Sequence, residues 1–345
     1  VHLRNYSQYS LSKGALKLTE LVKFCHKNKF PAVSISDFSK FMSETDHHLK
    51  FKAMGCPCEI RLTAHSRSLG EKVLRSSQRE ALRFERKYSR YRKNSVISRI
   101  NQAAGRSPVT IDPETHALLE YSGACYEESD GLFDITSGVL RRIWNPNTKS
   151  VPQQGEIKRC LDIIGWGKVV LESDAVFLKQ PDMELDFGGV VKEYAADAIA
   201  FQARQKGIHN GYINLGGDIK IIGPQRDGAP WSIGVSNPSR PEKPSAIILL
   251  DKGAVSTSGC YERFMMINGK RYSHLLNPKT GWPVEGLESV SVSTTKALIA
   301  GSLSSIALLK GETEGINFLQ SCDVPFFAID QSGIHHDSSA KLVKA

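Results

Sequence analysis

The sequence predicts an α+β fold with mixed or antiparallel sheets and flanking helices. Alternation of apolar and polar residues over 51–64 and 288–294 is typical of half-buried strands. Further strands are expected at 168–178, 212–222, 231–235 and 325–329, and helices at 71–87, 113–127, 190–205, 297–310 and 312–321. Because helices and strands do not alternate regularly, a doubly wound parallel sheet is not expected.

Individual residues indicate where some elements begin or turn. Asp112 is a favourable N-cap, and Pro113 follows it at the first helical position. Thr136 is expected to cap a further helix. Asn268 and Gly269 favour a type I′ turn, so the apolar segments on either side of them are expected to form a hairpin.

Composition limits the classes of function. Hydrophobic residues make up 40% and charged residues 23% of the chain, as in ordinary globular proteins. The net charge is +9, but the basic residues are scattered among 36 acidic ones, so no nucleic-acid partner is expected. No apolar stretch approaches the roughly 20 residues that a transmembrane helix needs.

The compartment is predicted from the N-terminus and the cysteines. The first residues carry charges throughout, unlike a signal peptide. The seven cysteines lack zinc spacing, and Cys56 and Cys58 are expected to pack within a strand rather than bind metal. The chain as written is therefore expected in the cytoplasm, with a membrane-anchored periplasmic location as the alternative if its start is misassigned.

The chain divides into three predicted parts. The sequence of residues 1–38 resembles the N-terminal part of the PHP domain of bacterial DNA polymerase III alpha subunits. Such a domain binds metal through closely spaced histidines, and only His2 is present, so no polymerase or phosphoesterase activity is expected. Residues 39–49, which are polar and rich in His, Ser and Asp, are expected to be a linker, and residues 50–345 the main domain.

Residues 184–197 suit a phosphorylated ligand. A short apolar run leads to Asp186, then Gly188 and Gly189 follow, and an amphipathic helix begins at once. Glycines let a ligand approach the backbone, and a helix N-terminus favours phosphate. Lys192, one turn into the helix, adds a positive charge. A Gly-Gly pair before a helix is also common as a plain tight turn.

Six other loops accompany this stretch in a definite order. They are Met54-Gly55, Ser89-Arg90-Tyr91, Leu132-Phe133-Asp134, Asn214-x-Gly-Gly-Asp218, Thr257-Ser258-Gly259 and Tyr272-Ser273-His274. Over residues 51–329 this order resembles the ApbE family of FAD:protein FMN transferases. The resemblance implies a two-lobed α+β fold with FAD in a cleft. It also implies magnesium-assisted cleavage of FAD, attachment of FMN through a phosphoester to a Thr or Ser of an acceptor flavoprotein, and release of AMP.

The resemblance also implies roles for individual residues. Those expected to contact the cofactor are Met54, Tyr91, Leu132, Phe133, Asp134, Asp186, Lys192, Thr257, Ser258 and Leu275. Met54 and Tyr91 would pack against the flavin ring, and Lys192 would neutralise phosphate or hold Asp186. His274 would be the catalytic base.

Taken singly, several of these residues have plainer interpretations. Met54 and Phe133 could be core residues, and Tyr91 a surface aromatic. Asp134 could be only a loop or cap residue, and Asp218 could serve a Gly-Gly turn. His274 could be an ordinary cross-strand neighbour.

The predicted magnesium site departs from the family pattern. In the family, an Asp and a Thr of the last helix bind the ion together with a backbone carbonyl of the Gly-Gly loop. The corresponding positions are Gly301, Ser305 and Gly189. Loss of the carboxylate weakens a site for a hard cation, although the phosphates of FAD can still hold the ion. Glu193, where the family commonly has Gly, is a candidate replacement, but the expectation is an exposed helix residue.

Two functions follow from the resemblance. The first is an FMN transferase, and the second is a non-catalytic relative that binds FAD, which Gly301 keeps open. A third, an interaction module tied to replication, depends on residues 1–38 alone. Transfer of flavin to an acceptor with release of AMP separates the first two.

Overall fold

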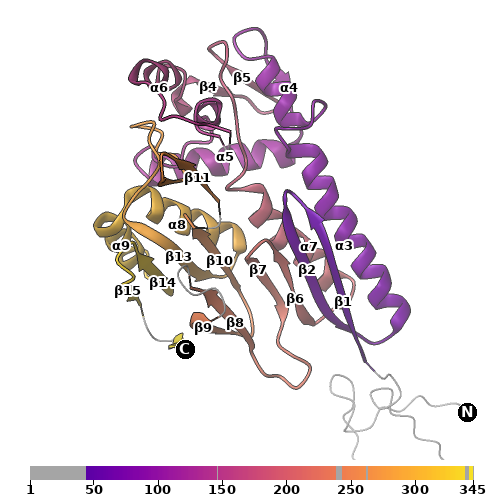
Figure 1. The fold of residues 1–345 in the computed structure, drawn as a ribbon. Coiled ribbons are helices and arrows are strands. Elements are labelled where there is room, and N and C mark those ends of the chain that lie inside the picture. The colour runs from indigo at the N-terminus through magenta and orange to yellow at the C-terminus, as the bar shows by residue number, and fades with distance from the viewer. Residues whose placement is uncertain (1–43, 146, 238–242, 262, 339–341, 345) are drawn as a thin grey trace, which may run out of the picture.

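The computed structural model describes residues 44–145, 147–237, 243–261, 263–338 and 342–344. The PHP-like segment and the first residues of the predicted linker lie outside this part. The described chain has the predicted α+β fold, with helices packed against one face of a large sheet (Figure 1). No helix within the described ranges combines the length and apolar composition that crossing a membrane requires.

The central sheet has eight strands, and every neighbouring pair is antiparallel. In spatial order they are β1 (Thr45–Ala53), β2 (Cys56–Ala64), β6 (Asn210–Leu215), β7 (Asp218–Gly223), β10 (Ala254–Gly259), β13 (Leu287–Thr294), β14 (Phe326–Asp330) and β15 (His335–Asp337). Strands from both ends of the chain therefore share one sheet.

The first hairpin corrects two predictions. Residues 51–64 form two strands rather than one, and the chain turns at Met54 and Gly55, whose φ angles are 51° and 73°. The predicted linker is also wrong from Thr45 onward, because β1 begins there. Residues of β1 alternate between half-buried and exposed, and their polar composition hides this period of two.

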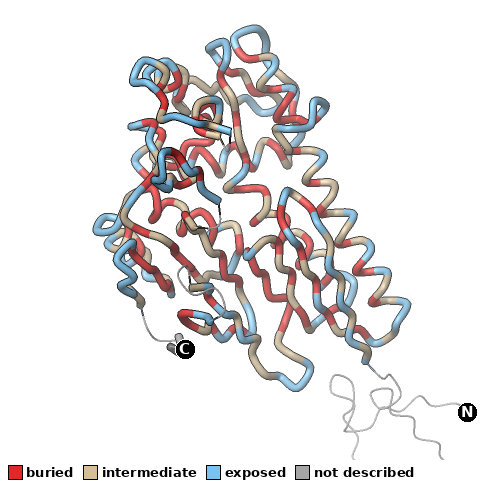
Figure 2. The backbone as a smooth tube through the Cα atoms, in the orientation of Figure 1, coloured by how far each residue is buried: buried red, intermediate tan, exposed pale blue. Residues whose placement is uncertain are grey.

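Three helices cover one face of the sheet: α3 (Arg67–Tyr88), α7 (Val191–Gln205) and α8 (Ala297–Lys310). The buried segments lie between these helices and the strands (Figure 2). Helix α9 (Glu312–Ser321) follows α8 directly and packs beside it.

The opposite face of the sheet packs against three further strands. They are β8 (Trp231–Ser236), β9 (Pro244–Leu250) and β16 (Leu342–Lys344), in the order β16-β9-β8. Ile221, Ile248 and Phe327 lie in the apolar core between the two layers. Of these strands only β8 was predicted.

A smaller group of elements forms the upper part of Figure 1. It contains α4 (Val96–Gln102), α5 (Pro113–Glu128), α6 (Gln154–Leu161), the 3-10 helices η1 (Gly138–Arg142) and η2 (Trp166–Lys168), and a sheet of β3 (Val109–Thr110), β5 (Ala175–Leu178) and β4 (Val169–Leu171). As predicted, Asp112 caps α5, and its carboxylate accepts from the Thr115 N–H at 2.9 Å. The prediction that Thr136 caps a helix is wrong, because its hydroxyl donates to Asp134 and the next element is the short η1.

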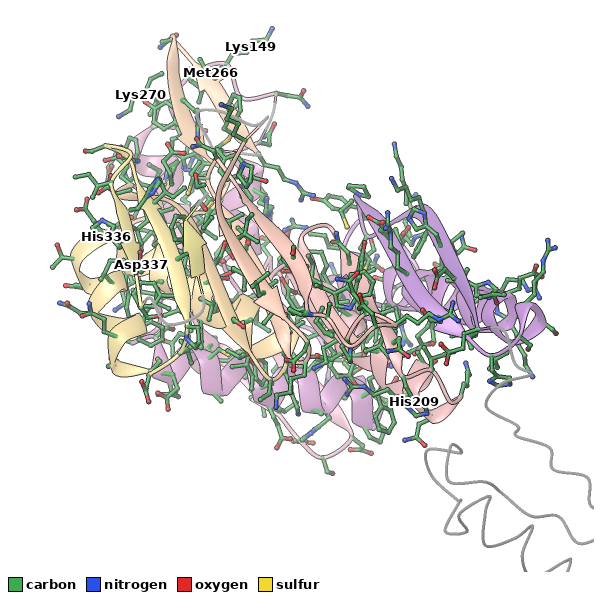
Figure 3. All side chains as sticks on the ribbon, turned by 90° about the horizontal axis from the view of Figure 1, so that it is seen from below. Lys149, His209, Met266, Lys270, His336 and Asp337 are labelled. Carbon is green, nitrogen blue, oxygen red and sulfur yellow. The ribbon has the colours of Figure 1, made fainter. Side chains whose placement is uncertain are left out.

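The predicted hairpin around Asn268 and Gly269 is confirmed. Strands β11 (Phe264–Ile267) and β12 (Lys270–Ser273) pair antiparallel, and both turn residues have positive φ. Figure 3 shows Met266 and Lys270 on this hairpin, which projects from the body of the molecule. Its base leads to His274 and therefore to the candidate site.

Candidate functional site

A cavity of about 1020 Å³ opens where the predicted loops meet. Its size is at the upper end of cofactor sites, which are roughly 300–1,000 Å³. The predicted site residues on its wall are Leu132, Phe133, Asp134, Asp186, Gly189, Lys192, Thr257, Ser258, His274, Leu275 and Ser305. Most of the predicted constellation is therefore brought together in one place.

Asp186 lies at the centre of an ion-pair network. One carboxylate oxygen accepts from the Gly188 N–H at 2.9 Å, which fixes the turn before α7. The other lies 3.1 Å from Nη1 of Arg90 and 3.2 Å from Nε of Arg141. Of the two roles predicted for Lys192, that of holding Asp186 is wrong, because Arg90 and Arg141 bind this carboxylate instead. Only the remaining lone pairs of Asp186 are open to a ligand.

Lys192 is held by two other carboxylates. Its Nζ forms an ion pair with buried Asp218 and lies 3.3 Å from Oε1 of Glu193. Asp218 is therefore a counterion and not merely a residue of the Gly-Gly turn. The side chain of Val190, the N-cap residue, makes no capping hydrogen bond to α7, and both Gly188 and Gly189 line the cavity there. The start of α7 thus offers the cavity the backbone of the two glycines and the positive charge of Lys192, which two carboxylates already share.

The loop after α5 is built around Asp134. Its carboxylate accepts from the N–H and the hydroxyl of Thr136, both at 2.7 Å, and from the Trp166 N–H at 3.2 Å. Burial raises the pKa of this carboxyl group. Asp134 therefore holds the loop, and neighbouring Phe133 packs beside the backbone of Gly189.

His274 has the tautomer that a base requires. Its Nδ1 lies 2.9 Å from the carbonyl oxygen of Arg263, and a carbonyl can only accept, so Nδ1 carries the proton. The lone pair is therefore on Nε2. Burial together with the charges of Arg141 and Arg263 lowers the pKa of His274 to about 4. The imidazole is neutral at pH 7 and can accept a proton on Nε2.

Met54 and Tyr91 do not line the cavity. The Tyr91 side chain is exposed, and Met54 lies in the β1–β2 turn. Contacts tie both to the same edge of the molecule, because Glu85 accepts from the Met54 N–H at 2.9 Å and from Arg92, next to Tyr91, at 2.7 Å. Their packing against a flavin ring stays a prediction.

Several residues of the site carry no signal in the sequence. Arg90 lies behind the wall and pairs with Asp186, and Arg141 lines the cavity itself. Cys56 and Cys58 are buried as expected, yet both also line the cavity, with their sulfur atoms 4.0 Å apart. The hydrogen bond between the thiols is the main cause that lowers the pKa of Cys56 to about 7. Cys56 directly follows the predicted Met54-Gly55 loop, and this position is the sequence signal that places the two cysteines near the site.

Glu193 is buried, which contradicts the expectation of an exposed helix residue. It is only 5% exposed and lies on the wall of the cavity. Gly301, in the facing helix α8, is not on the wall, and a Cβ atom there would lie 2.5 Å from Cγ of Glu193. Because Gly301 has no side chain, the side chain of Glu193 has room to pack against α8.

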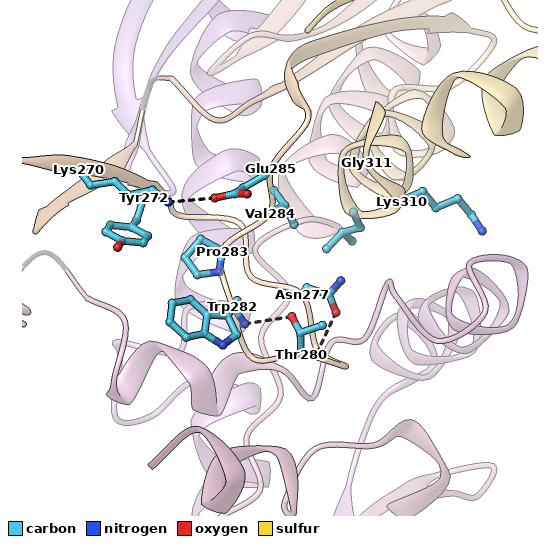
Figure 4. A pocket seen from close by; sticks show the side chains of 11 residues that line it. Lys270, Tyr272, Asn277, Thr280, Trp282, Pro283, Val284, Glu285, Lys310 and Gly311 are labelled. Atoms are coloured by element: carbon cyan, nitrogen blue, oxygen red, sulfur yellow. Dashed lines mark hydrogen bonds and ion pairs between the residues drawn. The ribbon is translucent and has the colours of Figure 1, made fainter. Parts of the chain in front are cut away.

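A second cavity of about 400 Å³ lies beside the β11–β12 hairpin (Figure 4). It is lined by Tyr272, Trp282 and the turn that contains Asn277. The amide oxygen of Asn277 accepts from the N–H groups of Lys279 and Thr280, so this residue shapes its own turn. None of the predicted site residues lies on this wall.

The sequence of this chain matches a known protein family. The model of the ApbE family matches residues 54–327 of this chain. The chain belongs to the ApbE family. A family member from Klebsiella pneumoniae (strain 342), named FAD:protein FMN transferase, is 33% identical over 251 residues, which cover 71% of this chain and 76% of that protein. A protein of the same name from Vibrio cholerae is 27% identical over 290 residues and covers 82% and 86%.

Solved ApbE structures share the fold. The ApbE protein of Thermotoga maritima superposes with a TM-score of 0.80 at 28% identity, covering 86% of this chain and 97% of that one. The flavin transferase ApbE of Vibrio cholerae gives a TM-score of 0.77 at 25% identity, covering 86% and 98%. Both similarities extend over nearly the whole of the solved chains.

Proposed function

We propose that this protein is an FAD:protein FMN transferase that modifies an acceptor flavoprotein. Membership of the ApbE family supports this proposal, as do relatives that carry this name. The observation that carries it is the single cavity that holds His274, Asp186 and the start of α7 together. The neutral imidazole of His274 and the glycine turn before α7 line this same cavity.

The proposed reaction transfers the FMN part of FAD to a hydroxyl group. The oxygen of an acceptor Thr or Ser attacks the phosphorus atom of the FMN phosphate and forms a P–O bond. The bond from that phosphorus to the bridging oxygen breaks, and AMP leaves with the electron pair. Nε2 of His274 takes the hydroxyl proton, a role that its neutral state at pH 7 allows.

Cationic groups on the wall are suited to the charge of the pyrophosphate. Lys192, Arg141 and Arg263 all line the cavity, and the start of α7 adds backbone dipoles. We propose that Asp186, held by its two arginines, accepts from polar groups of the flavin or ribose. Leu132, Phe133 and Leu275 would provide the apolar contact surface, with Thr257 and Ser258 in the same cleft.

A magnesium ion fits the oxygen donors of this wall. The carbonyl of Gly189 and the hydroxyl of Ser305 are candidate ligands, and a buried oxygen of Glu193 lacks a hydrogen-bond partner among the described residues. When bound, such an ion would neutralise charge on the pyrophosphate.

The test is incubation of the full chain with FAD, MgCl₂ and a flavoprotein domain that carries a Thr or Ser flavinylation site. The expected result is flavin fluorescence that stays with the acceptor on a denaturing gel. His274→Gln, which cannot accept the proton, is expected to lower the rate by about 10²–10⁴-fold while FAD still binds. Bound FAD without transfer by the wild-type chain would favour the non-catalytic alternative.

A further inference from the structure

We infer that Glu193 supplies the carboxylate of a divalent-cation site in the cavity, with Gly189 and Ser305 as the other protein donors. The cation would be Mg²⁺ or the chemically similar Mn²⁺. The carboxylate thus comes from α7 and not from position 301 in α8. The catalytic role of the ion rests on the proposed function, but its binding can be tested separately.

The first argument is an unsatisfied oxygen. Oε1 of Glu193 lies 3.3 Å from Nζ of Lys192, whereas buried Oε2 has no hydrogen-bond partner within the described ranges. A buried carboxylate is costly unless its oxygens are paired or coordinate a metal. Glu193 lies on the cavity wall, so its carboxylate borders the space in which a bound ion would lie.

The local charge also favours a cation. Lys192 is shared by two carboxylates, those of Glu193 and Asp218. The single ammonium group of Lys192 therefore serves two carboxylates, and of the Glu193 oxygens it lies near Oε1. A divalent ion would pair with the free oxygen, Oε2.

The facing helix explains why Glu193 fits. A Cβ atom at position 301 would lie 2.5 Å from Cγ and 3.2 Å from Oε1 of Glu193. The carboxylate of Glu193 thus lies in the space that a side chain at Gly301 would enter. Glycine inside a helix costs about 1 kcal/mol relative to alanine, so its presence here needs a reason. Room for Glu193 is that reason, and an aspartate at 301 would deliver its carboxylate to the same space.

Hydroxyl groups provide further hard donors nearby. Oγ of Ser305 lies 3.0 Å from Oγ of Ser258, which lies 2.8 Å from Oγ of Ser304. Ser258 and Ser305 line the cavity together with Gly189 and Glu193. An oxygen-only donor set with one carboxylate matches the preference of Mg²⁺, which usually keeps several waters and bonds to phosphate as well.

The test is titration of the full chain with Mn²⁺, with the free ion followed by electron paramagnetic resonance, in the presence and absence of FAD. Glu193→Gln keeps the shape and removes the charge, and should weaken Mn²⁺ binding by on the order of tenfold or more. Glu312→Gln is the matched control, because Glu312, Asp330 and His336 form the one group of three clustered His, Cys, Asp or Glu ligands in the described ranges. Unchanged affinity in Glu193→Gln, or loss only in Glu312→Gln, would overturn the assignment.

A relocated carboxylate gives a second, independent readout. Gly301→Asp alone should lower the Tm, because its Cβ meets Glu193, while Glu193→Ala alone should lose Mn²⁺ affinity. The double variant Glu193→Ala/Gly301→Asp should regain both. A folded double variant that still binds Mn²⁺ as poorly as Glu193→Ala would contradict the shared position of the two carboxylates.

Two further outcomes separate this site from the proposed function. Mn²⁺ binding that depends on Glu193, without any FMN transfer, would support the site and count against the transferase. FMN transfer whose Mg²⁺ dependence is the same in Glu193→Gln and wild type would overturn the site and leave the transferase intact.

Discussion

Arg90→Ala tests whether Arg90 stabilises the cavity wall or is merely a charged surface residue. The Arg90 side chain is 14% exposed and lies 2.6 Å from Glu184 and 3.1 Å from Asp186. It also donates to the carbonyl of Gly138 at 3.1 Å. Its loss therefore affects both the turn before α7 and the first residue of η1.

The size of the effect follows from the partners that remain. Breaking a buried ion pair costs about 3–5 kcal/mol when the other charge is left alone. Here Asp186 keeps Arg141 at 3.2 Å and Glu184 keeps Arg142 at 2.6 Å, so the lower end of that range applies. For a chain of 345 residues, a loss of about 3 kcal/mol corresponds to a Tm lower by about 4 °C.

The assay is thermal and urea unfolding of wild type, Arg90→Ala and the control Arg92→Ala. The Arg92 side chain is 51% exposed, and within the described residues its one ion-pair partner is Glu85, so the control should cost less than about 1 kcal/mol. FAD affinity should also fall in Arg90→Ala, because Asp186 loses one of its two arginines. Equal Tm values for the two variants would refute the view that Arg90 organises the cavity wall.

Two further predictions concern titratable groups of the cavity. Because folding lowers the pKa of His274 to about 4 and an unfolded histidine titrates near about 6.5, the unfolded state binds the proton first on acidification. The free energy of unfolding of wild type should therefore fall as the pH falls from about 6.5 to about 4. That of His274→Gln should fall less over the same window in urea titrations. Parallel curves of unfolding free energy against pH for the two proteins would contradict the assigned pKa. Cys56, whose pKa is lowered to about 7, should react with iodoacetamide at pH 7 faster than Cys58, and FAD should slow the reaction. Peptide mapping that finds Cys58 modified first would contradict this order.

Local sequence features predicted much of the fold. Helices α8 and α9 were expected at the residues where they occur, and the hairpin at Asn268-Gly269 follows from turn chemistry alone. The polar composition of strand β1 hides its alternation, and the Met54-Gly55 turn interrupts a pattern that reads as one strand, so the first hairpin differs from the prediction. These errors are local.

The site was harder to predict because its contacts join distant residues. The family resemblance, which rests on the order of the loops, predicts that His274 and Asp186 lie in one cavity, and both line it. No local pattern, however, indicates that Arg90 pairs with Asp186 or that Glu193 is buried. Glu193 is buried because Gly301, in another helix, has no side chain in its way. This relation between the two residues is visible only once the two helices are packed together.

The most direct test of the central claim is a paired measurement on one reaction of the full chain with FAD, MgCl₂ and an acceptor domain. Intact-mass spectrometry measures the fraction of acceptor that gains one FMN, and chromatography measures the AMP released. The account predicts equal molar amounts of the two products, and neither product when the acceptor hydroxyl is replaced by alanine. AMP formed without any gain of acceptor mass, or an acceptor that gains the mass of intact FAD, would contradict it.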